Sequence, residues 1–158
     1  MARVYNNIRV TATVGGQKYH FRSKLEYNWA QYLDFLQSAE EIIDWSYETE
    51  LFIFHGVTRA PVQYRPDFRV IEKDGTTVFQ ECKGYHDGQT NSKLRLMAKH
   101  YPDVVMELVR QNIPKSGGKG ANRLFNAKRY VRRIIDASVI FKQLKGYINF
   151  DVPKLREL

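Results

Sequence analysis

Cysteine is nearly absent from this chain of 158 residues, in which Cys82 is the single example. One thiol excludes an internal disulfide framework and a cysteine-rich zinc site. The chain also lacks any run approaching the roughly 20 apolar residues that span a bilayer. Its first residues carry no apolar core of a secretory signal. These absences lead us to expect a cytoplasmic protein that does not enter a membrane.

Acidic residues are in the minority, with 17 Asp and Glu against 25 Lys and Arg and a net charge of +8. A basic balance favours a polyanionic partner, because each phosphate that is neutralised releases counterions. Charge alone is weak evidence, since many basic proteins bind nothing specific. With 43% hydrophobic and 13% aromatic residues, the chain has the composition of a folded protein. Its length predicts one domain over residues 1–158.

The N-terminal half changes its hydrophobic period near Ser23. Alternating apolar residues on both sides of Gly15-Gly16 predict a β-hairpin over residues 8–21. Apolar residues then recur at helical spacing and predict a helix over residues 24–38. Residues 42–54 are typical of one long strand or two short ones. Residues 62–72 and 76–83 predict two further strands, joined by a hairpin turn at residues 73–75.

The C-terminal half predicts a helix over residues 91–100 and a strand over 103–109, expected to be the last of the sheet. Residues 114–121 hold three glycines and predict a loop, without the residue order of a phosphate-binding P-loop. Asn122 is expected to cap a final basic helix reaching about Leu144. The predicted fold is α/β: a mixed β-sheet flanked by helices, with an N-terminal β-hairpin and a C-terminal basic helix.

Two carboxylates are predicted to face each other across the hairpin. Asp67 lies seven residues before Asp74, and Glu81 lies seven after it. Like charges directly opposite each other destabilise a strand pair unless a cation lies between them, and Mg²⁺ prefers such hard oxygen ligands. Lys83 shares the face of Glu81 and would lie near enough to orient an attacking water. The simpler alternative is a solvated strand on which Lys83 pairs with Glu81.

The spacing of these residues resembles a known pattern. Pro66-Asp67, thirteen further residues and then Glu81-x-Lys83-Gly84 are similar to the motif of the PD-(D/E)xK nuclease superfamily. The resemblance implies a restriction-endonuclease-like fold and hydrolysis of DNA with Mg²⁺ or Mn²⁺. It also implies that Asp67 and Glu81 hold the metal, that the carbonyl of Cys82 adds a ligand, and that Lys83 assists the attacking water.

The helix before the sheet commonly supplies another metal-binding glutamate in that superfamily, and here the residue is Glu26. The alternative is a capping box in which Glu26 only closes the start of the helix with Ser23. Glu26 lies at the edge of the apolar stripe, which favours a side chain turned toward the sheet. We therefore predict Glu26, Asp67, Glu81 and Lys83 as the catalytic set.

Small phage and prophage members of the superfamily are similar over more of the chain, about residues 15–109. The similar segments are Ser23-Lys24-Leu25-Glu26, Tyr64-Arg65-Pro66-Asp67-Phe68, and the later Tyr101-Pro102. This resemblance implies a phage- or prophage-encoded enzyme in a bacterial cell, acting on branched DNA in recombination or replication as a Holliday junction resolvase does. Two symmetric cuts in a junction would require a homodimer.

Two residues near the motif have simpler interpretations. Glu48 and Glu50 share a face of the strand after the first helix. Some relatives with the implied fold place an extra glutamate there, but a solvated strand face is the simpler interpretation of Glu48. Cys82 is expected to pack under a helix on the face opposite Glu81, without the neighbouring base that a catalytic thiolate needs.

The C-terminal third, residues 114–145, lies outside the resemblance and is rich in cations. On a helix, four of them would form one stripe beside the cations of the glycine loop. We expect this stripe to bind phosphates without sequence readout. The predicted nucleic-acid contacts are Lys115, Lys119, Arg123, Lys128, Arg129, Arg132 and Arg133.

The sequence leaves two alternatives to a junction-cutting endonuclease. One is a site-specific nicking or homing-type endonuclease with the same core, in which the hairpin or the basic region reads a sequence. The other is a non-catalytic basic DNA-binding or assembly protein that retains the nuclease core without cutting.

Overall fold

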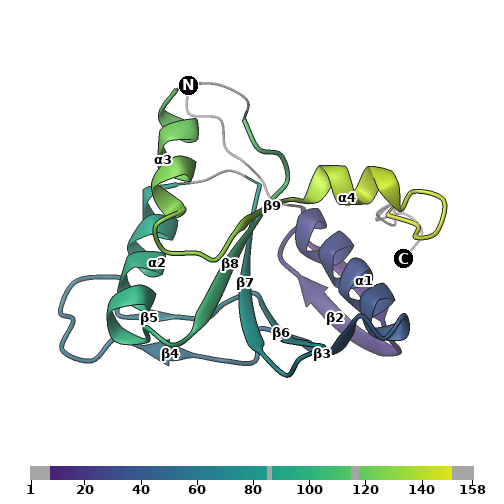
Figure 1. Cartoon of the computed structure of the whole chain (residues 1–158), viewed down its shortest axis with the longest axis horizontal. Coiled ribbons are helices and arrows are strands. Elements are labelled where there is room, and N and C mark those ends of the chain that lie inside the picture. Colours follow the sequence, from purple (N-terminus) through teal and green to yellow (C-terminus); the bar gives the residue numbers. More distant parts are fainter. Residues whose placement is uncertain (1–7, 85–86, 115–117, 151–158) are drawn as a thin grey trace.

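The computed structural model describes residues 8–84, 87–114 and 118–150. Figure 1 shows a central sheet with helices on both sides. In chain order the elements are β1 (Val10–Val14), β2 (Gln17–Phe21), α1 (Lys24–Ser38), β3 (Ile42–Tyr47), β4 (Phe52–Ile53), β5 (Gln63–Tyr64), β6 (Phe68–Glu72), β7 (Thr77–Lys83), α2 (Gly88–His100), β8 (Val105–Arg110), α3 (Lys119–Ala127), β9 (Ile134–Asp136) and α4 (Ala137–Gln143). None of the described helices is long and apolar enough to cross a membrane.

The central sheet has the strand order β3-β6-β7-β8-β9. Strands β3, β6 and β7 pair antiparallel, whereas β7, β8 and β9 run parallel. Strand β7 is covered on both faces, so residues 78–82 are all buried, including the polar Gln80 and Glu81. The predicted mixed α/β fold is confirmed, and it is compatible with a restriction-endonuclease-like architecture.

Two apolar cores lie on opposite faces of this sheet. One core joins the β1–β2 hairpin, α1 and α4 to residues such as Phe68, Cys82 and Val109. The other joins the short β4–β5 pair, α2 and α3 to residues such as Phe79 and Leu108. In Figure 1, α1 and α4 accordingly lie on one side of the sheet, and α2 and α3 on the other.

Helix α1 begins and ends where the hydrophobic period predicted. Ser23 caps its N-terminus by accepting the peptide N–H of Glu26 on its hydroxyl oxygen. Leu25, Trp29 and Leu33 form the buried stripe that packs on the first core. The packed stripe fixes the rotation of α1, so that its first turn faces the end of the sheet.

The β6–β7 hairpin sets the level of the predicted carboxylates. Gly75 adopts a left-handed φ of 89° at the turn, and Asp74 accepts the peptide N–H of Thr76. Phe68 pairs with Gln80, and Val70 with Val78. The same register, continued by one residue, places Asp67 level with Glu81, as the count from the turn predicted.

Two element boundaries differ from the sequence prediction, whereas residues 42–54 form two short strands, which is one of the two predicted forms. Residues 62–72, predicted as one strand, are divided into β5 and β6. Pro66 lies between β5, which pairs with β4, and β6, which pairs with β3 and β7. Because proline has no N–H to donate, it does not continue either strand's hydrogen-bond ladder. Helix α2 begins at Gly88, earlier than predicted, because Asp87 caps it through the peptide N–H of Thr90.

The predicted single helix from Asn122 to about Leu144 is wrong. Helix α3 ends at Ala127, and β9 follows as a further strand parallel to β8, which is therefore not the last strand of the sheet. The backbone of residues 132–133 already pairs with β8: the Arg132 N–H donates to the Met106 carbonyl, and the Leu108 N–H donates to the Arg133 carbonyl. A helix would leave those groups of β8 without partners.

Candidate functional site

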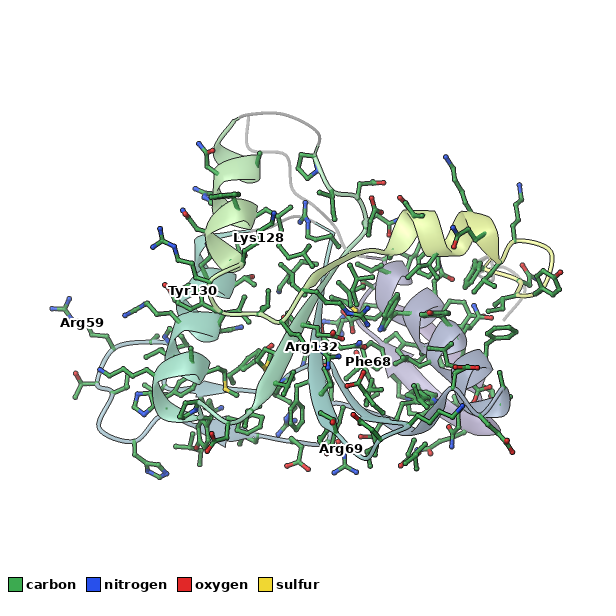
Figure 2. All side chains as sticks on the ribbon, in the orientation of Figure 1. Arg59, Phe68, Arg69, Lys128, Tyr130 and Arg132 are labelled. Carbon is green, nitrogen blue, oxygen red and sulfur yellow. The ribbon has the colours of Figure 1, made fainter. Side chains whose placement is uncertain are left out.

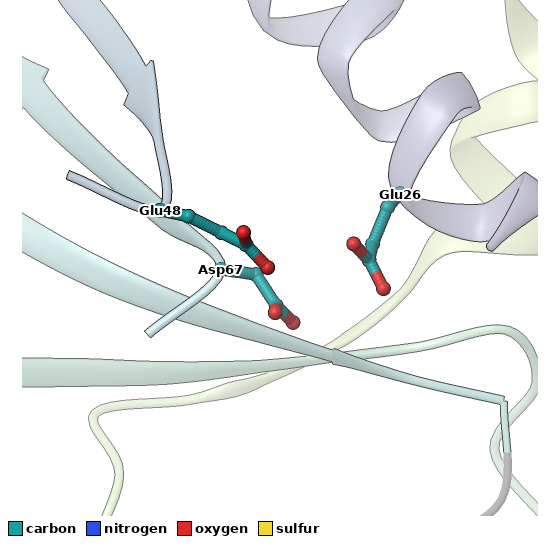
Figure 3. A group of neighbouring side chains, drawn as sticks. All are labelled: Glu26, Glu48 and Asp67. Atoms are coloured by element: carbon teal, nitrogen blue, oxygen red, sulfur yellow. The ribbon is translucent and has the colours of Figure 1, made fainter. Parts of the chain in front are cut away.

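Three carboxylates from separate elements meet at one end of the sheet. Glu26 comes from the first turn of α1, Glu48 follows β3, and Asp67 precedes β6. Each offers a carboxylate oxygen, and these oxygens lie within 4.8 Å of one another. Figure 3 shows Glu26 facing the other two carboxylates from the helix. Such a group is a candidate cation site built entirely from oxygen ligands.

Glu26 is held by two hydroxyls and is 6% exposed. The Ser23 hydroxyl donates to one carboxylate oxygen at 3.1 Å, and the Tyr47 hydroxyl donates to the other. Burial raises the pKa of Glu26, although these two hydrogen bonds oppose the shift. The helix cap and the carboxylate cluster therefore coexist, and Glu26 takes part in both.

Asp67 is 9% exposed and accepts the peptide N–H of Cys82 at 2.8 Å. Burial raises the pKa of Asp67 well above its ordinary value, and the charges of Glu81 and Glu26 raise it further. The hydrogen bond from Cys82 opposes this but does not cancel it. The carboxylate is thus fixed in position by the neighbouring strand, at a place where negative charge is costly.

Glu81 and Lys83 form a second pair beside the carboxylate cluster. The Tyr64 hydroxyl donates to Glu81 at 2.6 Å, and the Lys83 Nζ lies 3.3 Å from the other Glu81 oxygen. Burial lowers the pKa of Lys83, but the charges of Glu81 and Asp67 outweigh it and the net pKa is raised. Lys83 is therefore a cation at neutral pH. Glu81 also acts electrostatically on Asp67, although it is not part of the tight cluster.

Glu48 corrects a sequence expectation, because it is not on a solvated strand face. Strand β3 ends at Tyr47, and Glu48 adopts a left-handed φ of 52° that turns its side chain out of the strand alternation. Its N–H donates to the Asp67 carbonyl at 2.8 Å. Its side chain is 22% exposed and pairs with Arg22 at 3.0 Å. The backbone bond ties Glu48 directly to Asp67.

A cavity of about 540 Å³ opens beside the carboxylates. Glu26, Asp67 and Glu81 line it together with five cations, which are Arg22, Lys24, Arg65, Lys83 and Lys93. Lys93 reaches in from α2, with its Nζ 5.7 Å from the centre of the Tyr64 ring. Glu26, Asp67 and Glu81 are buried, whereas the five cations are half-buried or exposed. Buried carboxylates beside accessible cations suit a phosphodiester neutralised by a metal ion.

Comparison with known proteins identifies the family. Residues 5–116 match the model of a family described as "Protein of unknown function (DUF1064)". The chain belongs to the DUF1064 family. No curated protein is detectably similar to it. One solved structure, described as "Structure of EndoMS-dsDNA2 complex", is similar at 20% identity and a TM-score of 0.35. The match covers 72% of this DUF1064 chain and 45% of the EndoMS chain, so this chain spans less than half of that neighbour.

The sequence interpretation of this DUF1064 chain missed two tyrosines and placed Glu48 wrongly. Tyr47 and Tyr64 donate their hydroxyls to Glu26 and Glu81. Tyr64 belongs to the segment that resembles the nuclease motif, and that was the available signal. Nothing in the periodicity distinguishes Tyr47 from other core aromatics, since it also packs on Phe68.

Cys82 is a core residue in this DUF1064 fold, as predicted. Its side chain is buried in the core beneath α1, and burial raises the pKa of the thiol well above its ordinary value. A thiolate is therefore disfavoured. The role of the Cys82 carbonyl as a metal ligand stays a prediction.

The predicted basic stripe of this DUF1064 chain is wrong in its geometry. Lys115 lies outside the described residues, and so does the side chain of Lys119. Arg123 belongs to α3, whereas Lys128 and Arg129 follow its end. Arg132 donates to Glu72 and Glu107, and Arg133 to Glu107 at 2.6 Å. In Figure 2, Lys128 lies by the end of α3, while Arg132 lies against the strands. The cations therefore do not form one helical face.

Proposed function

We propose that this chain is a metal-dependent DNA endonuclease. The observation that carries the proposal is the gathering of Glu26, Glu48 and Asp67, from three separate elements, within 4.8 Å of one another. Buried like charges at this distance are unfavourable without a compensating cation. Burial is the main cause of the raised pKa values of Glu26 and Asp67, and the charge of Glu81 raises both further.

The donor set fits Mg²⁺ or Mn²⁺. Both are hard cations that prefer carboxylate oxygens, and Mg²⁺ is usually held by one or two carboxylates together with substrate phosphate. Glu26 and Asp67 would hold the ion, with Glu48 as a third ligand and Glu81 at the margin. The carbonyl of Cys82 is proposed as a further ligand. When bound, the ion supplies Lewis acidity toward the phosphodiester.

The other residues of the cavity have separate tasks. Lys83 keeps its positive charge and would stabilise the charge that grows on the phosphate, or orient the attacking water. Tyr64 holds the Glu81 carboxylate in place through its hydroxyl. Arg22, Lys24, Arg65 and Lys93 line the same cavity and would position the DNA backbone.

Branched or structured DNA is the proposed substrate. No helix-turn-helix or zinc-finger module for reading a sequence is recognisable in the chain. Recognition of a junction, flap or nick needs shape and backbone contacts only. A junction resolvase would act as a homodimer, because its two cuts are related by symmetry.

Cleavage of defined DNA substrates tests the proposal. A four-way junction, a nicked duplex, a flap, a single strand and a random linear duplex would be incubated with Mg²⁺ or Mn²⁺. We expect wild-type protein to cut the branched forms preferentially, and Asp67→Asn and Lys83→Met to lower the rate by at least about 100-fold. Both variants should still bind DNA.

Matched controls are available in the turn of the same hairpin. Asp74→Asn and Lys73→Met change the same side-chain types at the far end of β6 and β7, where both residues are exposed, and should leave cleavage unchanged. Cutting of a single linear sequence would favour a site-specific nicking or homing-type enzyme. Failure of the wild-type protein to cut any of these DNAs with either metal would leave a non-catalytic DNA-binding or assembly protein.

A further inference from the structure

Helices α2 and α3 carry positive charge without any negative charge. Lys93, Arg95 and Lys99 lie on α2, and Lys119 and Arg123 on α3, whereas neither helix contains an Asp or Glu. The two helices lie side by side on one face of the sheet (Figure 1). The Asn91 side chain joins them by donating to the Arg123 carbonyl at 3.0 Å. Because both helices carry only positive charge, the surface that they form attracts anions.

A polar groove of about 480 Å³ lies between the two helices. It is lined by Asn91, Ser92, Arg95, Asn126, Arg129 and Tyr130. No aliphatic side chain contributes to this lining. Amide, hydroxyl and guanidinium groups are the donors that proteins use to bind the phosphates of a nucleic-acid backbone.

The arginines of this groove differ from several others in the fold. Arg22, Arg69, Arg132 and Arg133 each form an ion pair with a glutamate. Within residues 8–84, 87–114 and 118–150, Arg95 and Arg129 form no ion pair, and both are exposed. Two guanidinium groups without a carboxylate are therefore presented to an external anion.

An aromatic ring extends the same surface. Phe125 lies in the last turn of α3, four residues before Arg129 in the sequence, and is 67% exposed. The Lys128 Nζ lies 5.3 Å from its ring centre. An exposed ring with a lysine over it offers an apolar surface as well as charge, which fits the sugars, bases and phosphates of a nucleic acid better than an acidic peptide, which offers charge alone.

Helix α2 separates this groove from the candidate catalytic cavity. Lys93 lines the cavity, whereas Ser92 and Arg95 of the same helix line the groove. We infer that the α2–α3 groove is a second DNA-backbone site, in which Arg95 and Arg129 bind phosphates outside the catalytic cavity. The choice of DNA as partner rests on the proposed function, but the groove makes its own prediction about binding.

Binding measured without cleavage tests this inference. Fluorescence anisotropy of a labelled duplex and a labelled four-way junction would be recorded in EDTA at several salt concentrations. We expect the double variant Arg95→Ala/Arg129→Ala to weaken binding by at least about tenfold. The slope of log affinity against log salt should become shallower by about 0.9 for each duplex phosphate that the protein no longer neutralises, or about 1.8 for two phosphates.

Two further variants separate a phosphate contact from a general effect of charge or folding. Lys142→Ala/Lys145→Ala removes the same charge from exposed residues at and just beyond the end of α4, on the other side of the sheet, and should bind within about twofold of wild type. Arg95→Lys/Arg129→Lys keeps the charge and should recover most of the salt slope. The thermal unfolding midpoint of each variant verifies that the fold is retained.

The outcomes distinguish this inference from the proposed nuclease. If the Arg95→Ala/Arg129→Ala variant kept wild-type affinity and salt slope, or if the α4 control lost as much affinity, the groove would not be a DNA-binding site. Neither result would contradict the proposed nuclease activity. If DNA binding depended on Arg95 and Arg129 but the wild-type protein cut no DNA, the groove would stand as a DNA-binding site and the nuclease proposal would be refuted. Absence of DNA binding by wild type, or displacement of DNA by polyglutamate at equal charge concentration, would overturn DNA as the occupant.

Discussion

Asp67 and Glu81 lie at the same level of β6 and β7, but their carboxylates have different partners. Asp67 accepts the peptide N–H of Cys82, whereas Glu81 accepts the Tyr64 hydroxyl and pairs with Lys83. The negative charge of Glu81 is thus partly compensated within the protein. Asp67 shares the carboxylate cluster with Glu26 and Glu48, and burial together with the charges of Glu81 and Glu26 raises its pKa well above the ordinary value.

Removing the Asp67 charge should stabilise the metal-free protein. Because its pKa is raised on folding, the folded state holds the proton more tightly than the unfolded state. The contribution of protonated Asp67 to the free energy of unfolding is fully present below about pH 4, the ordinary carboxyl range, and is lost as the pH rises through the raised pKa. In EDTA at pH 8, Asp67→Asn should therefore raise the unfolding midpoint, by about 2–4 °C for each kcal/mol recovered. Thermal unfolding at pH 4 and pH 8 measures this.

Asp74→Asn is the control for that experiment. Asp74 is exposed in the hairpin turn, and hydrogen bonds from Thr76 lower its pKa rather than raise it. This substitution should give no gain in stability at pH 8. A gain equal to that of Asp67→Asn would show that the effect comes from net charge and not from the carboxylate cluster.

Glu48 should contribute to cation affinity, whereas Glu50 should not. Glu48 belongs to the carboxylate cluster, whereas Glu50, two residues later in the sequence, pairs with Arg69. We expect Glu48→Gln to weaken Mn²⁺ binding by about tenfold or more, which would remove about 1.4 kcal/mol of metal-dependent stabilisation at saturation. Calorimetric titration of the wild type, Glu48→Gln and Glu50→Gln measures it. Equal affinities in all three would exclude Glu48 from the site.

The Tyr64 hydroxyl should matter for cleavage through Glu81. Burial raises the pKa of Tyr64 well above its ordinary value, so the hydroxyl stays a donor over the working pH range. Tyr64→Phe removes this donor and keeps the ring that faces Lys93. We expect cleavage to fall by about 10- to 100-fold, as for other residues that orient a metal-site ligand.

Tyr101→Phe provides the matched comparison for Tyr64→Phe. Tyr101 donates its hydroxyl to the Ile53 carbonyl at 2.7 Å, away from the carboxylates. The two substitutions remove one hydroxyl each and differ in what that hydroxyl binds. Single-turnover rates at saturating metal would separate them, and similar rates for both variants would contradict an orienting role for Tyr64.

Glu107 should stabilise the fold in a pH-dependent way. Burial raises its pKa, but hydrogen bonds from Gln80, Arg133 and Arg132 outweigh burial and the net pKa is lowered. The stabilisation is therefore present above the ordinary carboxyl pKa and is lost as the pH falls through the lowered value. Glu107→Gln should cost about 1–3 kcal/mol at pH 7, and less below about pH 4.

Urea unfolding of wild type and Glu107→Gln at pH 7 and pH 3 tests that dependence. Glu41→Gln, which removes an exposed carboxylate after α1, is the control and should lie within about 0.5 kcal/mol of wild type at both pH values. A Glu107→Gln deficit that is the same at pH 3 as at pH 7 would mean that packing, and not charge, links β8 to Arg132 and Arg133.

The parts of the fold that sequence predicted are those set by local periodicity. Helix α1 has a capping serine and a regular apolar stripe, so its two ends were predictable. The level of Asp67 against Glu81 followed from counting residues around one tight turn. In both cases the information lies within about twenty residues of chain.

The rest depends on contacts between distant segments. The change of direction at Glu48 comes from one left-handed residue after β3, and strand alternation cannot foresee it. The cations after α3 have helical spacing, but Glu72 and Glu107 bind Arg132 and Arg133 from strands 25 or more residues away. Long-range pairing of this kind overrode the local pattern.

Strand β9 gives the folding unit a different boundary from the one that family similarity outlines. The family match ends at residue 116, whereas β9 begins at Ile134 and pairs with Leu108, Val109 and Arg110 of β8. A fragment trimmed to the matched region would leave β8 with a bare row of peptide groups, a template for association between copies. Expression designs for this chain should therefore extend past Asp136, because a shorter fragment would expose that edge of β8 to other copies.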